Sequence, residues 1–215
     1  MPSAFRPEPP ADCALCSRLV SFREAHAAAH PTWFNGAVPS FGHPDEARLL
    51  IVGLAPGIQG ANKTGRPFTG DYAGDLLYTT LIEFGFARGT YGAHADDGLT
   101  LIDTMITNAV RCVPPANKPT SAEINMCRSF LLDRMRSLKN LKAIVALGRV
   151  AHDSILTAFK LRKATHKFVH GARHEVCEGI YLYDSYHCSR YNTNTRVLTT
   201  EMFHDVFRAL HADLS

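Results

Sequence analysis

The sequence lacks any apolar run near the roughly 20 residues that span a bilayer, so no membrane helix is expected. It also lacks a strong charge of one sign. Its 23 Lys and Arg against 20 Asp and Glu give a mildly basic balance, which does not by itself indicate nucleic-acid binding. Residues 1–10 lack the apolar core of a secretory signal. These features favour an intracellular, cytoplasmic globular protein.

Cysteine is scarce as well, because six in 215 residues are too few for a disulfide framework. Cys13 and Cys16 form a C-x2-C pair, a spacing that lets two thiolates reach one metal centre. Cys112 and Cys127 bracket a Pro- and Asn-rich loop and could complete a four-thiolate site for zinc or an iron–sulfur cluster. The alternative is that some of these cysteines are small buried apolar side chains.

Apolar strands alternate with helices along the chain. Buried parallel strands are predicted at 48–53, 104–110 and 141–148, and further strands at 175–177 and 180–183. Helices are predicted at 17–30, 73–84, 121–138, 149–159 and 199–212. This alternation predicts an α/β fold with a central, mostly parallel sheet covered by helices on both faces, a single-domain three-layer α/β/α sandwich. We expect the domain to span 13–215, after a flexible N-terminal segment over 1–12.

The residues with the most chemistry follow the ends of the predicted strands, where ligands bind in such sheets. The loop 53–71 is rich in Gly but matches neither a dinucleotide nor a triphosphate motif, so it is either a turn-rich surface loop or a site of close backbone approach. Asn108 ends the second strand, where its amide could read a base edge or cap the strand. His187 follows the last strand and is either structural or catalytic.

Three segments resemble, in chain order, the motifs of the bacterial and archaeal family-5 (type b) uracil-DNA glycosylases. GLAPGIQGANKTGRPFTGD at 53–71 resembles the first motif, TNAVRCVPPANKP at 107–119 the central segment, and SYHCSRYNTNT at 185–195 the closing His motif. The resemblance covers nearly the whole chain. Cys188 departs from it, since these enzymes often have Pro there. The related family-4 enzymes carry an acidic residue early in the first motif, and 54–57 has none, which favours family 5.

The resemblance implies an enzyme that flips uracil out of DNA and hydrolyses its N-glycosidic bond, leaving an abasic site. Hypoxanthine and other deaminated bases are expected as further substrates. It implies a uracil-DNA glycosylase fold and a structural [4Fe–4S] cluster, and the matching ligands are Cys13, Cys16, Cys112 and Cys127. The resemblance implies that the protein acts as a monomer on double- and single-stranded DNA at the prokaryotic nucleoid.

The resemblance also implies roles for single residues. Phe68 would stack on the extruded base, Asn108 would read its Watson–Crick edge, and His187 would lie beside uracil O2 and stabilise the leaving anion. The backbone at Gly53, Ala55 and Gly57 would line the base pocket.

Other candidates rest on chemistry at the motif positions. Asp71 is the candidate carboxylate near the sugar, the alternative being an N-cap for the helix that follows. Asn62 is a candidate for holding water, and Arg190 and Tyr191 are candidates for a wedge into the duplex. Candidate phosphate contacts are Lys63, Arg66, Arg111 and Lys118.

Two other interpretations stay open. One is a noncatalytic iron–sulfur or zinc module that binds nucleic acid, and the other is a family-4-like glycosylase restricted to uracil. Because no Lys occupies a motif position that suggests a Schiff base, we expect a monofunctional glycosylase without a lyase step.

Overall fold

The computed structural model describes residues 5–214. Within them, a six-stranded sheet has the order β1-β5-β2-β6-β8-β7, in which the four inner strands run parallel and the two edge strands antiparallel to their neighbours. The strands of this sheet are β1 (Phe41–Gly42), β2 (Leu49–Gly53), β5 (Thr104–Asn108), β6 (Ala143–Leu147), β7 (Arg173–Cys177) and β8 (Ile180–Ser185).

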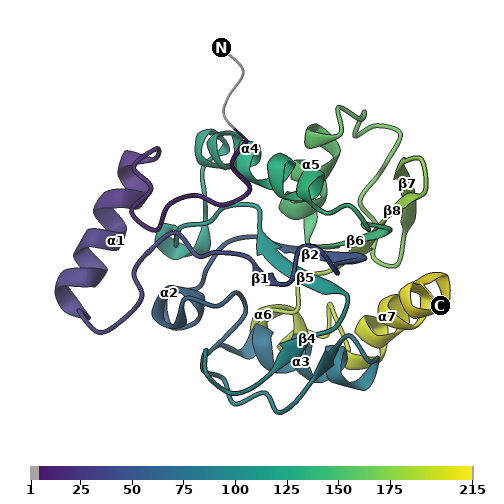
Figure 1. Cartoon of the computed structure of the whole chain (residues 1–215), viewed down its shortest axis with the longest axis horizontal. Coiled ribbons are helices and arrows are strands. Elements are labelled where there is room, and N and C mark those ends of the chain that lie inside the picture. The colour runs from purple at the N-terminus through teal and green to yellow at the C-terminus, as the bar shows by residue number, and fades with distance from the viewer. Residues whose placement is uncertain (1–4, 215) are drawn as a thin grey trace.

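Helices cover both faces of this sheet, which confirms the three-layer α/β/α prediction (Figure 1). One face packs against α3 (Tyr72–Glu83) and α7 (Thr200–Leu214), the other against α4 (Ser121–Ser137) and α5 (Arg149–Ala158). The remaining elements are α1 (Ser17–Ala29), α2 (Ala61–Thr64), β3 (Ala87–Arg88), β4 (Thr100–Leu101), a 3₁₀ turn (Pro115–Asn117) and α6 (Arg190–Asn194). Among the helices of residues 5–214, none has the length and apolar character that crossing a membrane requires.

The apolar run at β2 explains why the sheet is buried on both sides. Leu49 and Ile51 pack in the core under α3 and α7, while Leu50 and Val52 pack in the core under α4 and α5. Successive side chains of a strand point to opposite faces, so a strand covered on both faces needs apolar residues at every position.

The element boundaries differ from the predicted ones by a few residues. The strand predicted over 104–110 ends at Asn108, although the backbone N–H groups of Ala109 and Val110 still donate to the carbonyls of Gly53 and Leu54. Helix α4 begins after Thr120, whose side chain accepts from the backbone N–H of Glu123 in a capping box. The short elements β1, β3, β4, α2 and α6 were not predicted, because they are too short to show a hydrophobic period.

The flexible segment expected over 1–12 includes residues 1–4, which lie outside the described residues. Farther along, Glu8 forms ion pairs with the buried guanidinium groups of Arg111 and Arg134. Its carboxylate also accepts a hydrogen bond from the backbone N–H of Ser40, at 3.1 Å. Glu8 therefore supplies the negative charge that lets two arginines lie inside the domain.

We expect Glu8→Gln to lower the free energy of unfolding by about 2 kcal/mol, since hydrogen bonds to charged groups each contribute roughly 1.5–3 kcal/mol. The urea midpoint of the purified protein measures the effect. Glu46→Gln changes an exposed carboxylate and is the matched control. Equal midpoints for the two variants would show that the Glu8 ion pairs contribute no net stability.

Candidate active site

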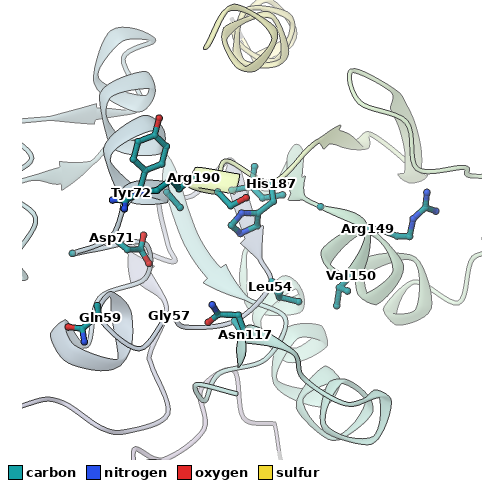
Figure 2. Close-up of a pocket in the computed structure, with 16 residues that line it drawn as sticks. Leu54, Gly57, Gln59, Asp71, Tyr72, Asn117, Arg149, Val150, His187 and Arg190 are labelled. Carbon is teal, nitrogen blue, oxygen red and sulfur yellow. The ribbon is translucent and has the colours of Figure 1, made fainter. Parts of the chain in front are cut away.

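A cavity of about 710 Å³ opens at the carboxyl edge of the sheet, a volume within the usual range of small-molecule sites. Figure 2 shows Asp71 and His187 facing this cavity from different elements, the start of α3 and the loop after β8. A smaller adjoining cavity of about 30 Å³ also has Phe68 and Asn108 in its walls. Ala55, Gly57, Asp71 and His187 line both cavities. The structure thus brings together the predicted carboxylate, aromatic ring, amide and imidazole.

Asp71 caps helix α3 and also lines the cavity. It is the N-cap of α3, and its Oδ1 accepts from the backbone N–H of Gly74 at 3.3 Å. Its Oδ2 lies so close to Gly57 and Gly60 that a Cβ at either glycine would come within 3.0 Å of it. Burial raises the pKa of the Asp71 carboxyl, and the N–H groups of Gly74 and Ala73 partly offset this rise. One oxygen therefore caps the helix while the carboxylate as a whole lines the cavity.

Because Gly53 has no side chain, the side chains of Asn108 and Phe68 can both pack close to its backbone. A Cβ at Gly53 would come within 3.0 Å of Asn108 Oδ1 and of the Phe68 ring. Asn108 is buried, and among the described residues its Oδ1 has no hydrogen-bond partner. A buried carbonyl oxygen without a donor is costly, so this atom is suited to an N–H group of a bound molecule.

Phe68 and His187 form opposite parts of the same small cavity. Their ring centroids are 5.9 Å apart, and the ring planes meet at 28°. Phe68 has a φ of +53°, a left-handed backbone conformation that costs energy for an aromatic residue and is often found at functional sites. Loss of hydration lowers the pKa of the His187 imidazole to about 4, so the ring is neutral at pH 7. A neutral imidazole still carries one N–H donor.

The loop after β8 is held by two contacts near His187. The Cys188 thiol is buried and donates to the carbonyl oxygen of Ala73 at 3.4 Å, and Asn192 donates from its amide to the carbonyl of His187 at 2.8 Å. Burial raises the pKa of the Cys188 thiol, which keeps it protonated. Cys188 therefore ties the His187 loop to the start of α3.

Arg66 is not placed to contact phosphate, contrary to the sequence-based expectation. Its guanidinium is buried and forms a bidentate ion pair with Asp97, at 2.6 and 2.7 Å. The rings of Phe41, Tyr78 and Tyr91 surround it, with centroids 5.0–5.9 Å from the guanidinium carbon. Because its charge is already matched inside the protein, Arg66 is not available to a phosphate. Its contacts instead hold the turn that carries Phe68.

Tyr78 and Tyr91, which lie beside Arg66, also hold the turn that carries Phe68, through their hydroxyl groups. Tyr78 donates to the carbonyl of Pro67 at 2.6 Å, and Tyr91 donates to the carbonyl of Phe68 at 3.2 Å. Tyr91 also accepts from the backbone N–H of Gly70. These contacts stabilise the left-handed conformation of Phe68, and sequence reasoning missed Tyr78, Tyr91 and Asp97.

Asn62 and Arg111 lie away from the cavity walls. Asn62 is fully buried and donates from its amide to Asn35 Oδ1 at 3.0 Å, and it is not among the residues that line either cavity. Among the described residues the Oδ1 of Asn62 has no hydrogen-bond partner, so a role for Asn62 in holding water stays a prediction. Arg111 is buried against Glu8, so a phosphate contact does not fit its position.

The other predicted DNA contacts are accessible. Lys63 and Lys118 are exposed. Arg190 lines the large cavity, with its guanidinium carbon 5.3 Å from the ring centroid of Tyr72. Tyr191 is 74% exposed on α6, next to the cavity rim. These side chains can reach a molecule outside the cavity.

Sequence reasoning missed the wall formed by Gly148, Arg149 and Val150 at the start of α5. These residues directly follow β6, at the same sheet edge as the three loops that were singled out. The rule that ligands bind beyond the carboxyl ends of parallel strands could have found them.

The four cysteines expected to bind a cluster come together in one buried group. Cys16 is the N-cap of α1, Cys112 follows β5, and Cys127 lies on α4, and all pack with Cys13 in one small core. Burial raises the pKa of the Cys112 thiol to about 12 and that of Cys127 to about 11, and the negative charges of the neighbouring thiolates add to both rises. A bound metal centre would offset this by stabilising the thiolates.

The spacing of these thiols bears on the kind of metal centre. Within the described residues, one group of three His, Cys, Asp or Glu residues has a ligand atom of each within 4.8 Å of the others. This group is His152, His174 and Asp184, and it contains no cysteine. A single tetrahedral zinc with Zn–S bonds of about 2.3 Å would need its sulfurs about 3.8 Å apart. No three cysteine sulfurs of the described residues lie that close to one another.

Comparison of the sequence with known proteins agrees with this geometry. The sequence model of the uracil DNA glycosylase superfamily, a protein family, matches residues 39–211 of this chain. The chain is 45% identical over 200 residues to a type-5 uracil-DNA glycosylase of Thermus thermophilus, an alignment that covers 90% of each chain. It is 38% identical to the type-5 enzyme of Pyrobaculum aerophilum, with 94% of this chain and 89% of that protein covered. A type-4 enzyme of Archaeoglobus fulgidus is 34% identical over 65% of this chain and 62% of its own length.

We expect Asp97→Asn to destabilise the fold by about 3 kcal/mol at pH 7, because it leaves the buried Arg66 cation without its counter-ion. Arg66 holds the pKa of the Asp97 carboxyl well below its usual range. The contribution of the ion pair is therefore complete above about pH 4 and is lost as the pH falls toward the lower, folded-state pKa.

Urea midpoints at pH 7 and pH 3 measure this difference, which should shrink in acid. Asp96→Asn removes an exposed neighbouring carboxylate and is the control. A destabilisation by Asp97→Asn that stays the same at both pH values would contradict an electrostatic origin.

Proposed function

This chain belongs to the uracil-DNA glycosylase superfamily, and we propose that it excises uracil from DNA by hydrolysing the N-glycosidic bond, leaving an abasic site. The observation that carries the proposal is the buried, unpartnered Oδ1 of Asn108 among the described residues, in a cavity that also presents Phe68, Asp71 and His187. A base that enters this cavity offers an N–H to Asn108 and a ring face to Phe68.

Extruding a nucleotide from a duplex costs a few kcal/mol, and stacking on one aromatic ring returns roughly 1–3 kcal/mol. The small cavity has room for about one water molecule, so a base must displace side chains as it enters. The large cavity beside it is lined by Arg190 and Tyr72 and is open to the sugar and its phosphates.

Recognition follows from the hydrogen-bonding pattern of the base. Uracil has a donor at N3 and an acceptor at O4, which match the Oδ1 and the amide N–H of Asn108. Cytosine carries an acceptor at N3 and would leave Asn108 Oδ1 unpaired, so it is rejected. Hypoxanthine also has an N–H beside a carbonyl. We therefore include hypoxanthine among the substrates, as expected of a type-5 rather than a uracil-restricted enzyme.

Cleavage builds positive charge on the sugar and negative charge on the leaving base. Asp71 is the carboxylate that faces the cavity, and it stabilises the oxocarbenium-like sugar or orients the attacking water. The positive end of α3, which Asp71 caps, favours its ionised form against the effect of burial. The neutral His187 donates a hydrogen bond toward O2 of the base and stabilises the anion as it forms. Among the described residues, no Lys lines either cavity, in keeping with a monofunctional enzyme.

DNA would lie across the exposed side of the cavity. Lys63, Lys118 and Arg190 would contact phosphates, and Tyr191 would fill the gap left by the flipped base; the support is that all four side chains are exposed. The enzyme would act as a monomer on double- or single-stranded DNA in the prokaryotic cytoplasm.

The four-cysteine group would hold a [4Fe–4S] cluster through Cys13, Cys16, Cys112 and Cys127. Its support is the buried donor set and the wide spacing of the sulfurs. Bound there, the cluster would supply structural cross-linking rather than reaction chemistry, because four thiolates occupy all of its protein-binding positions. It would join the N-terminal segment to α4 and to the loop after β5.

We expect Asp71→Asn to slow excision by about 10²–10⁴-fold and His187→Ala by about 10²–10³-fold, with little loss of DNA affinity. Alkaline strand cleavage of a labelled duplex with one U opposite G, under single-turnover conditions, measures excision. A hypoxanthine duplex is run in parallel, and fluorescence anisotropy measures binding.

Asp75→Asn changes an exposed carboxylate one turn along α3 and should keep wild-type activity. Tight DNA binding without cleavage by the wild-type protein would favour the noncatalytic module instead. Cleavage of the uracil duplex alone would indicate a uracil-restricted enzyme.

We expect the purified protein to be brown, with broad absorption in the blue and about four irons per chain. Cys112→Ser should lose iron and lower the unfolding temperature, whereas Cys177→Ser, at an exposed position away from the group, should change neither. Colourless protein that contains one zinc per chain would refute the cluster.

A further inference from the structure

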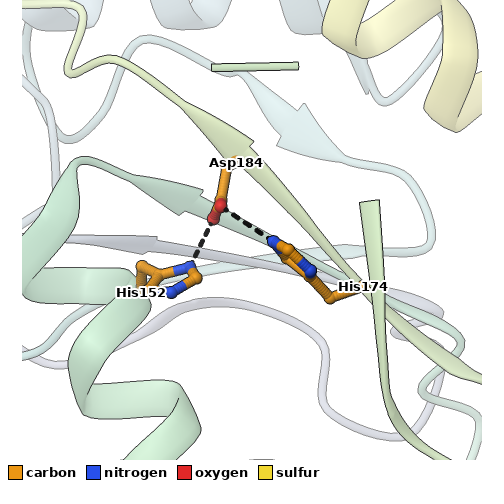
Figure 3. A group of neighbouring side chains, drawn as sticks. All are labelled: His152, His174 and Asp184. Carbon is orange, nitrogen blue, oxygen red and sulfur yellow. Dashed lines mark hydrogen bonds and ion pairs between the residues drawn. The ribbon is translucent and has the colours of Figure 1, made fainter. Parts of the chain in front are cut away.

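A second group of metal-ligating side chains lies behind the α5 wall of the large cavity. His152 comes from α5, His174 from the edge strand β7 and Asp184 from β8 (Figure 3). One ligand atom of each residue can be chosen so that all three lie within 4.8 Å of one another. His152 and Asp184 are almost completely buried, and the His174 side chain is 16% exposed.

The contacts of this trio are incomplete. His152 Nδ1 lies 2.7 Å from Asp184 Oδ1. His174 Nε2 lies 3.3 Å from Asp184 Oδ2, yet within the described residues neither of these two atoms makes a hydrogen bond. A buried carboxylate oxygen and a buried imidazole nitrogen that are close but misaligned for each other are suited to a third, shared partner.

We propose that His152, His174 and Asp184 bind a divalent transition-metal ion, zinc by preference. Two imidazoles and one carboxylate are a common zinc ligand set, and they leave a fourth position for water. The ligand atoms are His152 Nδ1, His174 Nε2 and a carboxylate oxygen of Asp184. A tetrahedral ion at about 2.0–2.2 Å from each ligand would set these atoms about 3.4 Å apart, and here one ligand atom of each residue lies within 4.8 Å of the others.

The surroundings of His152 support this assignment. Its Nε2 lies 2.9 Å from the carbonyl oxygen of His166, so Nε2 carries a hydrogen, and Nδ1 faces Asp184. At metal sites the ligand imidazole almost always donates its other N–H to a carboxylate, a backbone carbonyl or water. The metal ion would replace the proton that Nδ1 otherwise shares with Asp184.

The ion would join the edge strand β7 to α5 and β8, which both lead to walls of the cavity. Helix α5 supplies Arg149 and Val150 to the wall, and β8 leads directly to His187. The site takes no part in bond cleavage, because its ligands do not line the cavities. It would instead fix the position of the wall opposite Asp71, and it stands whether or not the proposed excision is correct.

The test uses the purified full-length protein with its cysteine-bound metal in place, and Zn²⁺ alone is the probe. Wild type, His174→Ala and His43→Ala are dialysed against micromolar zinc, and zinc and iron are measured per chain. His174 is chosen because it lies on an edge strand, and His43 is an exposed histidine outside the trio. Constant iron content shows that zinc has not displaced the other centre.

We expect wild type and His43→Ala to bind one more zinc per chain than His174→Ala, with at least a ~100-fold affinity difference by calorimetry. Zinc should raise the unfolding temperature of wild type and leave that of His174→Ala unchanged. If His174→Ala misfolds, as judged by circular dichroism without zinc, His174→Gln replaces it. Equal zinc binding by the variant, or none by wild type, would overturn the proposal and leave the trio as an ion pair.

Discussion

The close approach of backbone and side chains after β2 is possible only because three positions lack a Cβ. At Gly53 an added Cβ would collide with Asn108 and Phe68, and at Gly57 and Gly60 it would collide with Asp71. The positions of the Asn108 amide, the Phe68 ring and the Asp71 carboxylate therefore all depend on the same Gly-rich loop. This explains why the loop resembles a phosphate cradle in composition and yet has a different spacing. Its glycines make room for other side chains of the protein, not for a phosphate.

The electrostatics of the cavity follow from this packing. Asp71 is partly buried, which disfavours its charge, but it also caps α3, whose N-terminal N–H groups favour that charge. His187 is partly buried, and loss of hydration lowers the pKa of its imidazole to about 4, so the ring stays neutral. A carboxylate and a neutral donor at separate points of one apolar cavity suit a reaction that builds positive charge on the sugar and negative charge on the base.

Much of this could be predicted from the sequence, for identifiable reasons. Three of the four inner strands were predicted as buried parallel strands from their apolar runs, and so was the covered sheet, whereas β8 was predicted only as a further strand. Asp71, Phe68, Asn108 and His187 follow strand ends and stand in recognisable motifs. The burial of Arg66 could not be predicted, because its partner Asp97 is 31 residues away in a loop with no pattern. Arg149 was missed although it follows a predicted strand.

Phe68 shows why residues far from the cavity matter to the site. Its φ of +53° is unfavourable, so the conformation persists only because neighbouring groups enforce it. Those groups are the Arg66–Asp97 ion pair and the hydroxyls of Tyr78 and Tyr91, which bond to the backbone of 67–70. None of them touches the base in the proposed reaction. A cavity built from loops lacks the packing that holds a core side chain in place, so buried polar contacts provide that rigidity, and a change in one of them would displace the stacking ring without altering any group that reacts.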